Sequence, residues 1–350
     1  MIKKKIFIDI KKLLDQSLNP LFLFDDDCDG TCAYLILRKY KGSGYSVPVK
    51  GKPEVSMDYE KRIQEFKPDL IFVLDKPKIS QDFIDKINVP IVWIDHHPVQ
   101  NMQGIKIYCN PLLYNPSDNR STTYWSYQII KKFEWIALVG CVADYHIPDF
   151  ASDFSKKYPD LFPPTVKDPG EALYETQIGK LVKIFNFNLK GTTTEVRKSI
   201  NSLIKINDPY EILNGTSKES KFILSRFAKT DKIYEDLLNK SSKEYNDENF
   251  LIYTYPNNGF ALSSELATEL QYRFKEKFVI VGRVKDDEVV LSLRSNKYPV
   301  RDILLKSLEG ISGGAYGGGH LKACGAGIPK DQFSKFLNRF RDLALQLIKS

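Results

Sequence analysis

The amino-acid sequence predicts an α/β protein whose N-terminal domain is a parallel sheet with helices on both faces. Short runs that are apolar throughout alternate with helical patterns, and three of these runs lie at 21–24, 70–74 and 90–94. Strands that are apolar on both sides are typical of a sheet covered on both faces. The alternation of strands with helices is typical of parallel connections.

The remaining N-terminal elements follow from the same patterns. A further short strand is expected at 45–49. The helices are expected within 1–19 and at 31–40, 59–66, 81–87 and 120–132. Residues 135–142 form one more apolar segment, and we interpret Asp144 beyond it as another acid at a strand end.

The pattern changes near residue 150 and again near residue 246. Several prolines are followed by lysine-rich helical patterns without a motif, so 151–245 is interpreted as a helical connector between a domain at 1–150 and a smaller mixed α/β domain at 246–350. The C-terminal domain is expected to contain strands at 250–254, 277–284 and 288–294, and helices at 264–274, 300–308 and 331–348.

Length and composition limit the classes of protein to which this chain can belong. A chain of 350 residues is long enough for two domains, each with its own core. The net charge of +7 is compatible with a polyanionic partner, although a solvated lysine surface would give the same value. The five cysteines include no CxxC pair, and no apolar run is long enough to span a bilayer. We therefore expect a cytoplasmic protein without a membrane partner.

Acidic residues follow the predicted strands. Asp25, Asp27 and Asp29 come directly after the first strand, and in an extended chain they would share one face. Asp75 and Asp95 follow the next two strands. Ligands of parallel sheets bind at the carboxyl ends of the strands, so these carboxylates are expected to meet there. A solvated acidic loop that caps a helix is the alternative for the first group taken alone.

The histidines beside these acids point to metal chemistry. His96 and His97 follow Asp95, and neutral imidazole suits Mn, Fe, Co or Zn, while carboxylates suit Mg and Mn. Two metals bridged by a shared carboxylate would clamp a phosphate and generate a hydroxide. Asp75 is the candidate for the shared ligand, because a central strand end can reach both metals.

A second group of residues suggests a phosphate-holding module in the C-terminal domain. Gly317, Gly318 and Gly319 precede His320, and glycines let backbone N–H groups approach an anion closely. Arg294 near a strand end offers a bidentate fork for phosphate. A flexible glycine loop and a surface arginine are the alternatives.

These motifs together resemble the DHH phosphoesterase superfamily, named for the sequence found here as Asp95-His96-His97. The stretch from Asp25 to Gly30 is similar to its first motif in the form carried by RecJ-type exonucleases. Asp75 and Asp144 stand at the places of the second and fourth motifs. Residues 292–295 and 317–320, followed by Ala323 and Gly325, resemble the C-terminal DHHA1 domain. The resemblance covers about residues 18–147 and 250–345. The overall plan of the chain resembles archaeal-type DHH–DHHA1 proteins most.

The resemblance implies a role for each matching residue. It implies two Mn ions, with Mg or Co as alternatives, one held by Asp25, Asp27 and Asp75 and the other by Asp29, Asp75, His96 and Asp144. Asp27, Asp75, His96 and His97 would form the catalytic set, with His97 as a supporting or substrate-contacting residue. Gly317, Gly318, Gly319, Arg294 and His320 would bind the substrate phosphate or terminal nucleotide.

The sequence also departs from the family pattern. Asp26 and Cys28 stand between the acids of the first motif, and Lys76 follows Asp75 where a neutral residue is frequent. Lys76 could neutralise surplus negative charge. His146 is either an extra ligand or, with more support, a supporting or surface residue.

The expected function is a Mn-dependent exonuclease acting on single-stranded DNA, RNA or short oligonucleotides. A small-nucleotide phosphatase or a cyclic-dinucleotide phosphodiesterase would use the same metals in a narrower cleft. A replication or repair scaffold without nuclease activity is the non-enzymatic alternative, although the intact acids and histidines argue against it. A homodimer contact or a replication or repair partner protein is also open, because nothing in the middle helices decides between them.

Overall fold

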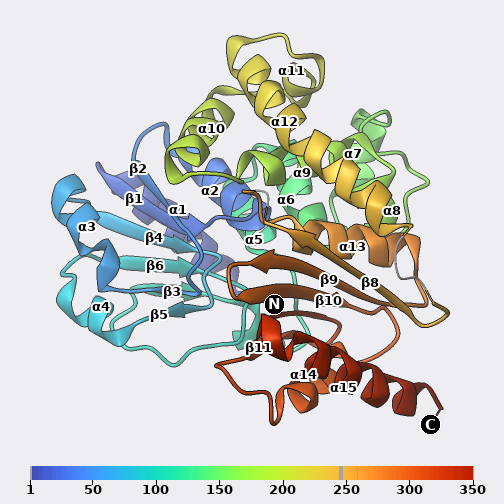
Figure 1. The fold of residues 1–350 in the computed structure, drawn as a ribbon. Coiled ribbons are helices and arrows are strands. Elements are labelled where there is room, and N and C mark those ends of the chain that lie inside the picture. The colour runs from blue at the N-terminus through green and yellow to red at the C-terminus, as the bar shows by residue number, and fades with distance from the viewer. Residues whose placement is uncertain (1, 244–246, 258, 350) are drawn as a thin grey trace. The chain divides into compact units, whose positions relative to one another are not determined.

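A computed structural model describes residues 2–243, 247–257 and 259–349 of the chain (Figure 1). It divides into two compact units, Met1–Phe227 and Ala228–Ser350, so the division falls within the long helix α12 (Lys218–Ser241). The three-part division at residues 150 and 245 stays a prediction, and its second boundary lies outside the described residues. No helix among the described residues is long and apolar enough to cross a membrane.

The first unit is built on a five-stranded sheet that is parallel throughout, which confirms the predicted fold class (Figure 1). Its strands, in spatial order, are β2 (Tyr45–Val49), β1 (Pro20–Asp25), β4 (Leu70–Leu74), β6 (Ile91–Ile94) and β7 (Ile107–Cys109). A separate two-stranded sheet pairs β3 (Glu54–Val55) with β5 (Lys78–Ile79).

Helices cover both faces of the parallel sheet, as the apolar strands predict. Phe22 and Phe72 pack on one face with residues of α1, α2, α5 and α6. Ile71 and Trp93 pack on the other face with residues of α3 and α4. These helices are α1 (Lys4–Gln16), α2 (Cys28–Lys41), α3 (Glu60–Phe66), α4 (Gln81–Lys86), α5 (Thr122–Ile130) and α6 (Glu134–Ala143). Because successive side chains of a strand point to opposite faces, β1, β4, β6 and β7 contribute to both cores.

The helices that follow extend the core of the first unit. They are α7 (Ala151–Lys157), α8 (Pro169–Tyr174), α9 (Gln177–Asn188), α10 (Thr193–Lys205) and α11 (Pro209–Asn214), followed by α12. Buried side chains of α9 and α10, such as Phe185 and Ile200, belong to the same apolar cluster as Phe22. This region therefore packs into the first unit as well as joining it to the second.

The second unit contains a mixed five-stranded sheet, as predicted. Its spatial order is β11 (Tyr316–His320), β12 (Ala323–Pro329), β10 (Glu288–Arg294), β9 (Phe278–Lys285) and β8 (Phe250–Pro256), with β8 and β9 parallel and the other pairs antiparallel. The helices are α13 (Ser263–Arg273), α14 (Val300–Leu308) and α15 (Lys330–Lys349). The glycine run 317–319 lies in β11, at the edge of the sheet, and pairs with β12. The glycine run, for which a flexible loop was the alternative, is thus an edge strand whose backbone has no side chains to shield it.

One local prediction of the first unit is wrong. Residues 135–142 lie in helix α6, so Asp144 caps the C-terminus of a helix and does not follow a strand. A wholly apolar run suits either element when it is buried on every side. The small residues of α6 permit the helical packing, because Gly140 lies directly against Thr123 of α5 and Cys32 of α2.

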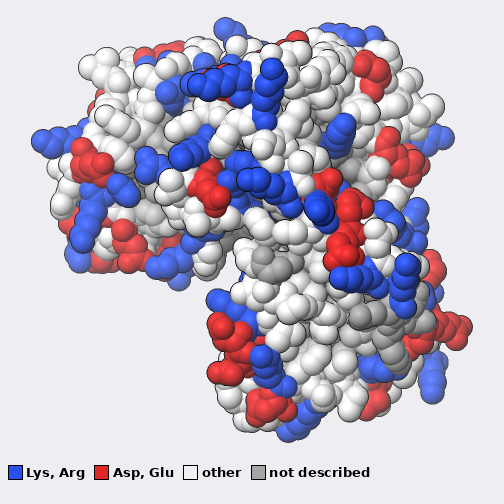
Figure 2. All heavy atoms as spheres, turned by 45° about the horizontal axis from the view of Figure 1, so that its top comes forward, with Lys and Arg blue, Asp and Glu red and all other residues white. Residues whose placement is uncertain are grey.

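Charged side chains are interspersed on the surface. On the face drawn in Figure 2, Lys and Arg side chains are mixed with Asp and Glu. The net charge of +7 therefore does not appear on that face as a field of one sign.

Substitution of Gly140 by Ala tests the close packing of α2, α5 and α6. An added Cβ would stand 2.7 Å from Cys32 Cβ and closer still to Thr123 Oγ1. We expect Gly140→Ala to lower the free energy of unfolding by about 1–3 kcal/mol, measured by denaturant titration. Gly318→Ala is the control, because its Cβ would meet nothing within 4 Å. Equal stability of the two variants would contradict the packing argument.

Candidate metal centre

The three acids of the first motif lie in a turn and not along an extended strand. Asp25 is the last residue of β1, and Asp27 is the N-cap of α2, where its Oδ1 accepts from the Gly30 N–H at 2.9 Å. Asp29 lies in the first turn of α2. The predicted shared face of an extended chain is therefore wrong. Gly30 makes the turn possible, since a Cβ there would stand 2.8 Å from the Asp25 carbonyl oxygen.

Asp29 connects this turn to helix α5. Its two carboxylate oxygens accept the backbone N–H groups of Thr122 and Thr123, both at 2.8 Å. The Thr123 hydroxyl donates in turn to the Asp29 carbonyl oxygen. A carboxylate at the N-terminus of a helix interacts favourably with the helix dipole. Asp29 therefore holds the start of α5 beside the first motif.

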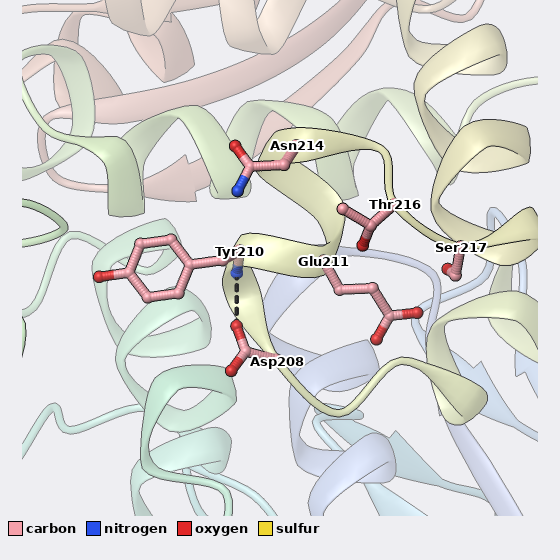
Figure 3. Close-up of a pocket in the computed structure, with 6 residues that line it drawn as sticks. All are labelled: Asp208, Tyr210, Glu211, Asn214, Thr216 and Ser217. Carbon is pink, nitrogen blue, oxygen red and sulfur yellow. Dashed lines mark hydrogen bonds between the residues drawn. The ribbon is translucent and has the colours of Figure 1, made fainter.

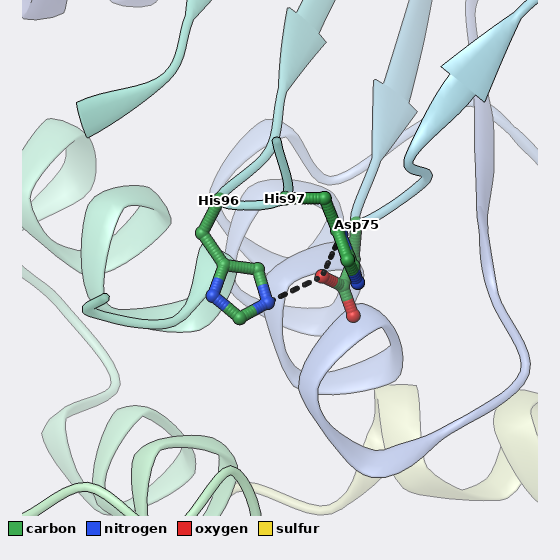
Figure 4. A group of neighbouring side chains, drawn as sticks. All are labelled: Asp75, His96 and His97. Carbon is green, nitrogen blue, oxygen red and sulfur yellow. Dashed lines mark ion pairs between the residues drawn. The ribbon is translucent and has the colours of Figure 1, made fainter. Parts of the chain in front are cut away.

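Asp75 and His96 come from the ends of neighbouring strands and point toward each other (Figure 4). His96 Nε2 lies 3.4 Å from Asp75 Oδ1, and the Thr122 hydroxyl donates to that same oxygen at 3.0 Å. Asp75 is buried and has a φ of 58°, a left-handed conformation that is uncommon outside glycine. Such backbone conformations cost free energy and cluster at functional sites.

Asp95 and Asn110 hold His97 in place. Asp95 is completely buried, and its carboxylate contacts His97 Nδ1 at 2.8 Å and accepts the His97 N–H at 3.1 Å. The Asn110 amide donates to the His97 carbonyl oxygen at 2.9 Å. Asp95 therefore orients His97, whereas His96 points toward Asp75.

Three groups of side chains could each hold a metal ion, with ligand atoms within 4.8 Å of one another. The groups are Asp25, Asp27 and Asp75; Asp29, His96 and Asp144; and Asp75, His96 and His97. Asp75 and His96 each occur in two groups. The structure thus brings together every predicted metal ligand, although their binding of an ion stays a prediction.

The electrostatics of the cluster suit a divalent cation. Burial and the Asp27 charge raise the pKa of Asp25 to about 7, and burial and the nearby acids raise that of Asp144 to about 8 despite His96. The pKa of Asp75 is raised well above its usual range by burial and by Asp29. Carboxylates that are this costly to ionise together are stabilised by a positive ion, and oxygen and imidazole ligands fit Mn or Mg.

The residues predicted to hold phosphate lie in the second unit. Arg294 and His320 are both opposite Ala323 of β12, one on each neighbouring strand, so they share one row of the sheet. The Arg294 guanidinium donates to the Ser264 hydroxyl at 2.9 Å and to the Cys324 carbonyl oxygen at 3.2 Å. These bonds fix the orientation of the guanidinium.

Sequence reasoning missed Thr122, Thr123 and Asn110 as parts of this centre. The signal for the two threonines is the run of three hydroxyl residues at 121–123, at the start of the helix expected at 120–132. His146 is in none of the three candidate metal groups of the described residues, and its buried Nε2 has no hydrogen-bond partner there. Its supporting role stays a prediction.

A surface pocket elsewhere in the first unit is unsuited to an anion (Figure 3). It contains two carboxylates, of which Asp208 caps α11 by accepting the Tyr210 N–H at 2.8 Å. The lining residues are Asp208, Tyr210, Glu211, Asn214, Thr216 and Ser217. We assign it no part in the chemistry.

Comparison with known proteins agrees with this architecture. Residues 247–346 match the DHHA1 domain family. RecJ of Thermus thermophilus, solved with Mn²⁺, superposes over 98% of this chain with a TM-score of 0.68 and 16% identity. This chain has the DHH–DHHA1 fold. It covers only 55% of that Thermus chain. No curated protein sequence matches it.

Two further solved structures share the DHH–DHHA1 fold over nearly their whole length. An exonuclease RecJ bound to manganese is 14% identical, with 97% of this chain and 94% of that chain covered and a TM-score of 0.64. The pGpG-specific phosphodiesterase PggH of Vibrio cholerae is 13% identical, with 95% and 99% covered and a TM-score of 0.50. The resemblance found in the motifs is thus confirmed by the fold.

The raised carboxylate pKa values predict how stability depends on pH when metal is removed. The folded protein keeps protons on Asp25 and Asp144 up to about pH 7 and 8, whereas an unfolded chain loses them near 3.8. Because the folded state then binds more protons, its stability falls as pH rises from about 4 to about 8. Thermal melting in a chelator should show this fall.

Two additional melts test the cause. Saturating Mn should remove most of the fall, because the bound ion favours the ionised carboxylates. Asp75→Asn should raise the melting temperature at about pH 8 without metal, since it removes one buried charge and keeps an acceptor for Thr122. A flat profile in the wild-type protein would contradict the raised pKa values.

Proposed function

We propose that the protein is a metal-dependent phosphodiesterase, and more specifically an exonuclease that hydrolyses single-stranded nucleic acid or short oligonucleotides. The observation that carries the proposal is the cluster of carboxylates and histidines, centred on the buried Asp75, in which Asp75 and His96 are shared between candidate ligand groups. The DHH–DHHA1 fold, which RecJ proteins solved with manganese also have, supports it.

The residues fit two divalent ions, with Mn as the first choice. Asp25, Asp27 and Asp75 would hold one ion, and Asp29, Asp75, His96 and Asp144 the other. When bound, such ions neutralise a phosphate and lower the pKa of a coordinated water to about 7. Asp75 would belong to both sets, and its left-handed backbone would help to orient its carboxylate toward them.

His97 would contact the substrate. Its Nδ1 faces the buried Asp95 carboxylate, so the ring has a fixed orientation and a preferred tautomer. With the Nδ1 proton directed to Asp95, Nε2 carries the lone pair of the neutral ring and would accept a hydrogen bond from the substrate. Asn110 secures the backbone of His97 in this orientation.

The DHHA1 domain would hold the end of the strand. Arg294 has its guanidinium fixed by Ser264 and Cys324, which prepares it for an anionic group. The glycines of β11 leave backbone atoms uncovered at the sheet edge, and His320 ends that strand. Backbone N–H groups and a basic side chain together suit a terminal phosphate.

A second candidate is a phosphodiesterase for dinucleotides. The fold shared with PggH, which is specific for pGpG, extends over 99% of that chain, whereas this chain covers about half of the Thermus RecJ. Two domains of this size are thus sufficient for a protein that acts on a dinucleotide. A small-nucleotide phosphatase or a cyclic-dinucleotide enzyme would differ in substrate and not in metal chemistry.

A panel of labelled substrates tests these functions. Oligomers of RNA and DNA, from two nucleotides to about thirty and labelled at either end, are incubated with protein and Mn, beside cyclic dinucleotides. We expect stepwise shortening from one end. Cleavage of only the shortest oligomers would favour the dinucleotide enzyme. Asp75→Ala should abolish turnover, and Asp82→Ala, which removes an exposed carboxylate, should not.

Turnover by Asp75→Ala in the presence of Mn would contradict the shared-ligand assignment. If the wild-type protein binds metal but cleaves none of the substrates, the result would favour a scaffold without nuclease activity.

His320→Ala tests the substrate-holding role of the second unit. We expect KM for a short oligonucleotide to rise about tenfold, the loss of one charge-assisted contact, with kcat and bound Mn nearly unchanged. Lys285→Ala, an exposed change in the same sheet, is the control. An unaltered KM, or loss of metal from the His320 variant, would refute this role.

A further inference from the structure

Lys76 is a buried cation inside the candidate metal centre. Its side chain is 2% exposed, and its Nζ lies 3.1 Å from Asp25 Oδ2. The same Nζ donates to the Lys52 carbonyl oxygen at 2.6 Å. A lysine is almost never this buried unless it is paired, so these two acceptors account for its position.

The backbone prevents Lys76 from moving aside. The indole N–H of Trp93 donates to the Lys76 carbonyl oxygen at 2.9 Å, and Asp75 before it has the left-handed conformation. The Asp75 N–H donates to the Ile94 carbonyl oxygen at 3.0 Å. These bonds fix the backbone of Lys76, and burial and the two acceptors of its Nζ hold the ammonium group on the side of Asp25.

This placement makes the two halves of the centre unequal. Asp25 already has both carboxylate oxygens engaged, Oδ1 by the Asp26 N–H at 2.8 Å and Oδ2 by Lys76. Asp29 also has both carboxylate oxygens engaged, but by backbone N–H groups that carry no formal charge. In the ion pairs of the described residues, Asp29 and Asp144 have no lysine or arginine partner and pair only with His96. A divalent cation at Asp25, Asp27 and Asp75 must therefore bind beside a positive charge and compete with it for Asp25.

We infer that Lys76 gives the two halves of the centre different affinities for metal. The group of Asp29, His96 and Asp144 fills first, and the group of Asp25, Asp27 and Asp75 fills only at a higher metal concentration. This inference rests on the metal centre of the proposed function and adds an order of occupancy to it. Activity would then follow the concentration of free metal over the range of the weaker site.

The test is a titration of chelator-treated full-length protein with Mn alone, followed by calorimetry and electron paramagnetic resonance. Two Mn ions that share a carboxylate are magnetically coupled, whereas a single ion gives an isolated six-line signal. We expect the wild-type protein to give the isolated signal up to one equivalent. The second equivalent should bind at least about tenfold more weakly, a difference of about 1.4 kcal/mol.

Lys76→Met should tighten the second site by about tenfold or more, because the competing charge is gone and Asp25 Oδ2 is released. The coupled signal should then appear near stoichiometric metal. Lys78→Met is the matched control: it removes the same charge two residues away, from an exposed pair with Glu54, and should leave the titration unchanged. Lys76→Gln provides a polar replacement if the methionine variant does not fold.

Three outcomes would overturn the inference. One is a wild-type protein that binds both ions with equal affinity, which needs no variant to observe. Another is a Lys76→Met or Lys76→Gln protein whose second site is unchanged or weaker. The third, no binding of Mn at all, would also remove the metal centre, whereas two equal sites would leave the proposed phosphodiesterase intact.

Discussion

Mutual repulsion among carboxylates crowded at one edge of the sheet, three of them buried, is the constraint on which the rest of this structure depends. The parallel strands deliver Asp25, Asp75 and Asp95 to one edge of the sheet, and the following helices add Asp27, Asp29 and Asp144. Bringing like charges together away from water is unfavourable, and the raised pKa values of Asp25 and Asp144 express that cost. Apolar packing on both faces of the sheet holds the carboxylates in place against this repulsion.

The protein relieves part of the repulsion without a metal ion. Asp29 is satisfied by two backbone N–H groups at the start of α5, and Asp95 by the ring and backbone of His97. Asp25 is paired with Lys76. The acids therefore have different local roles, and a cation is needed most where these internal partners are absent.

Prediction from the sequence succeeded where one strong local signal was sufficient. The buried strands at Leu70–Leu74 and Ile91–Ile94 were found within a residue, because proline or acidic residues bound short apolar runs. The prediction failed where the local sequence suits a helix and a strand equally well and tertiary packing decides between them. The apolar run in α6 is buried on all sides, so periodicity could not identify its type. The three-residue strand β7 carries too little pattern to be found.

The candidate site was predicted in membership but not in its construction. The acids of the first motif meet through a strand end, a helix cap and a helical turn, whereas their spacing suggested one extended strand. The roles of Thr122 and Asn110 depend on contacts between residues far apart in the chain, which no local pattern encodes. The glycine run likewise became an edge strand because β12 pairs with it.

Asp29 both closes the start of α5 and belongs to a candidate metal group, and this combination affects how relatives of such a chain would diverge. Asp29 closes the start of α5 with both of its oxygens, whereas Asp144 ends α6 without such a structural role in the described hydrogen bonds. If the proposed hydrolysis were lost in a descendant, Asp144 could be lost with it, but selection for a folded protein would still retain Asp29. Survival of the first motif in a sequence is therefore weaker evidence of chemistry than survival of the last acid.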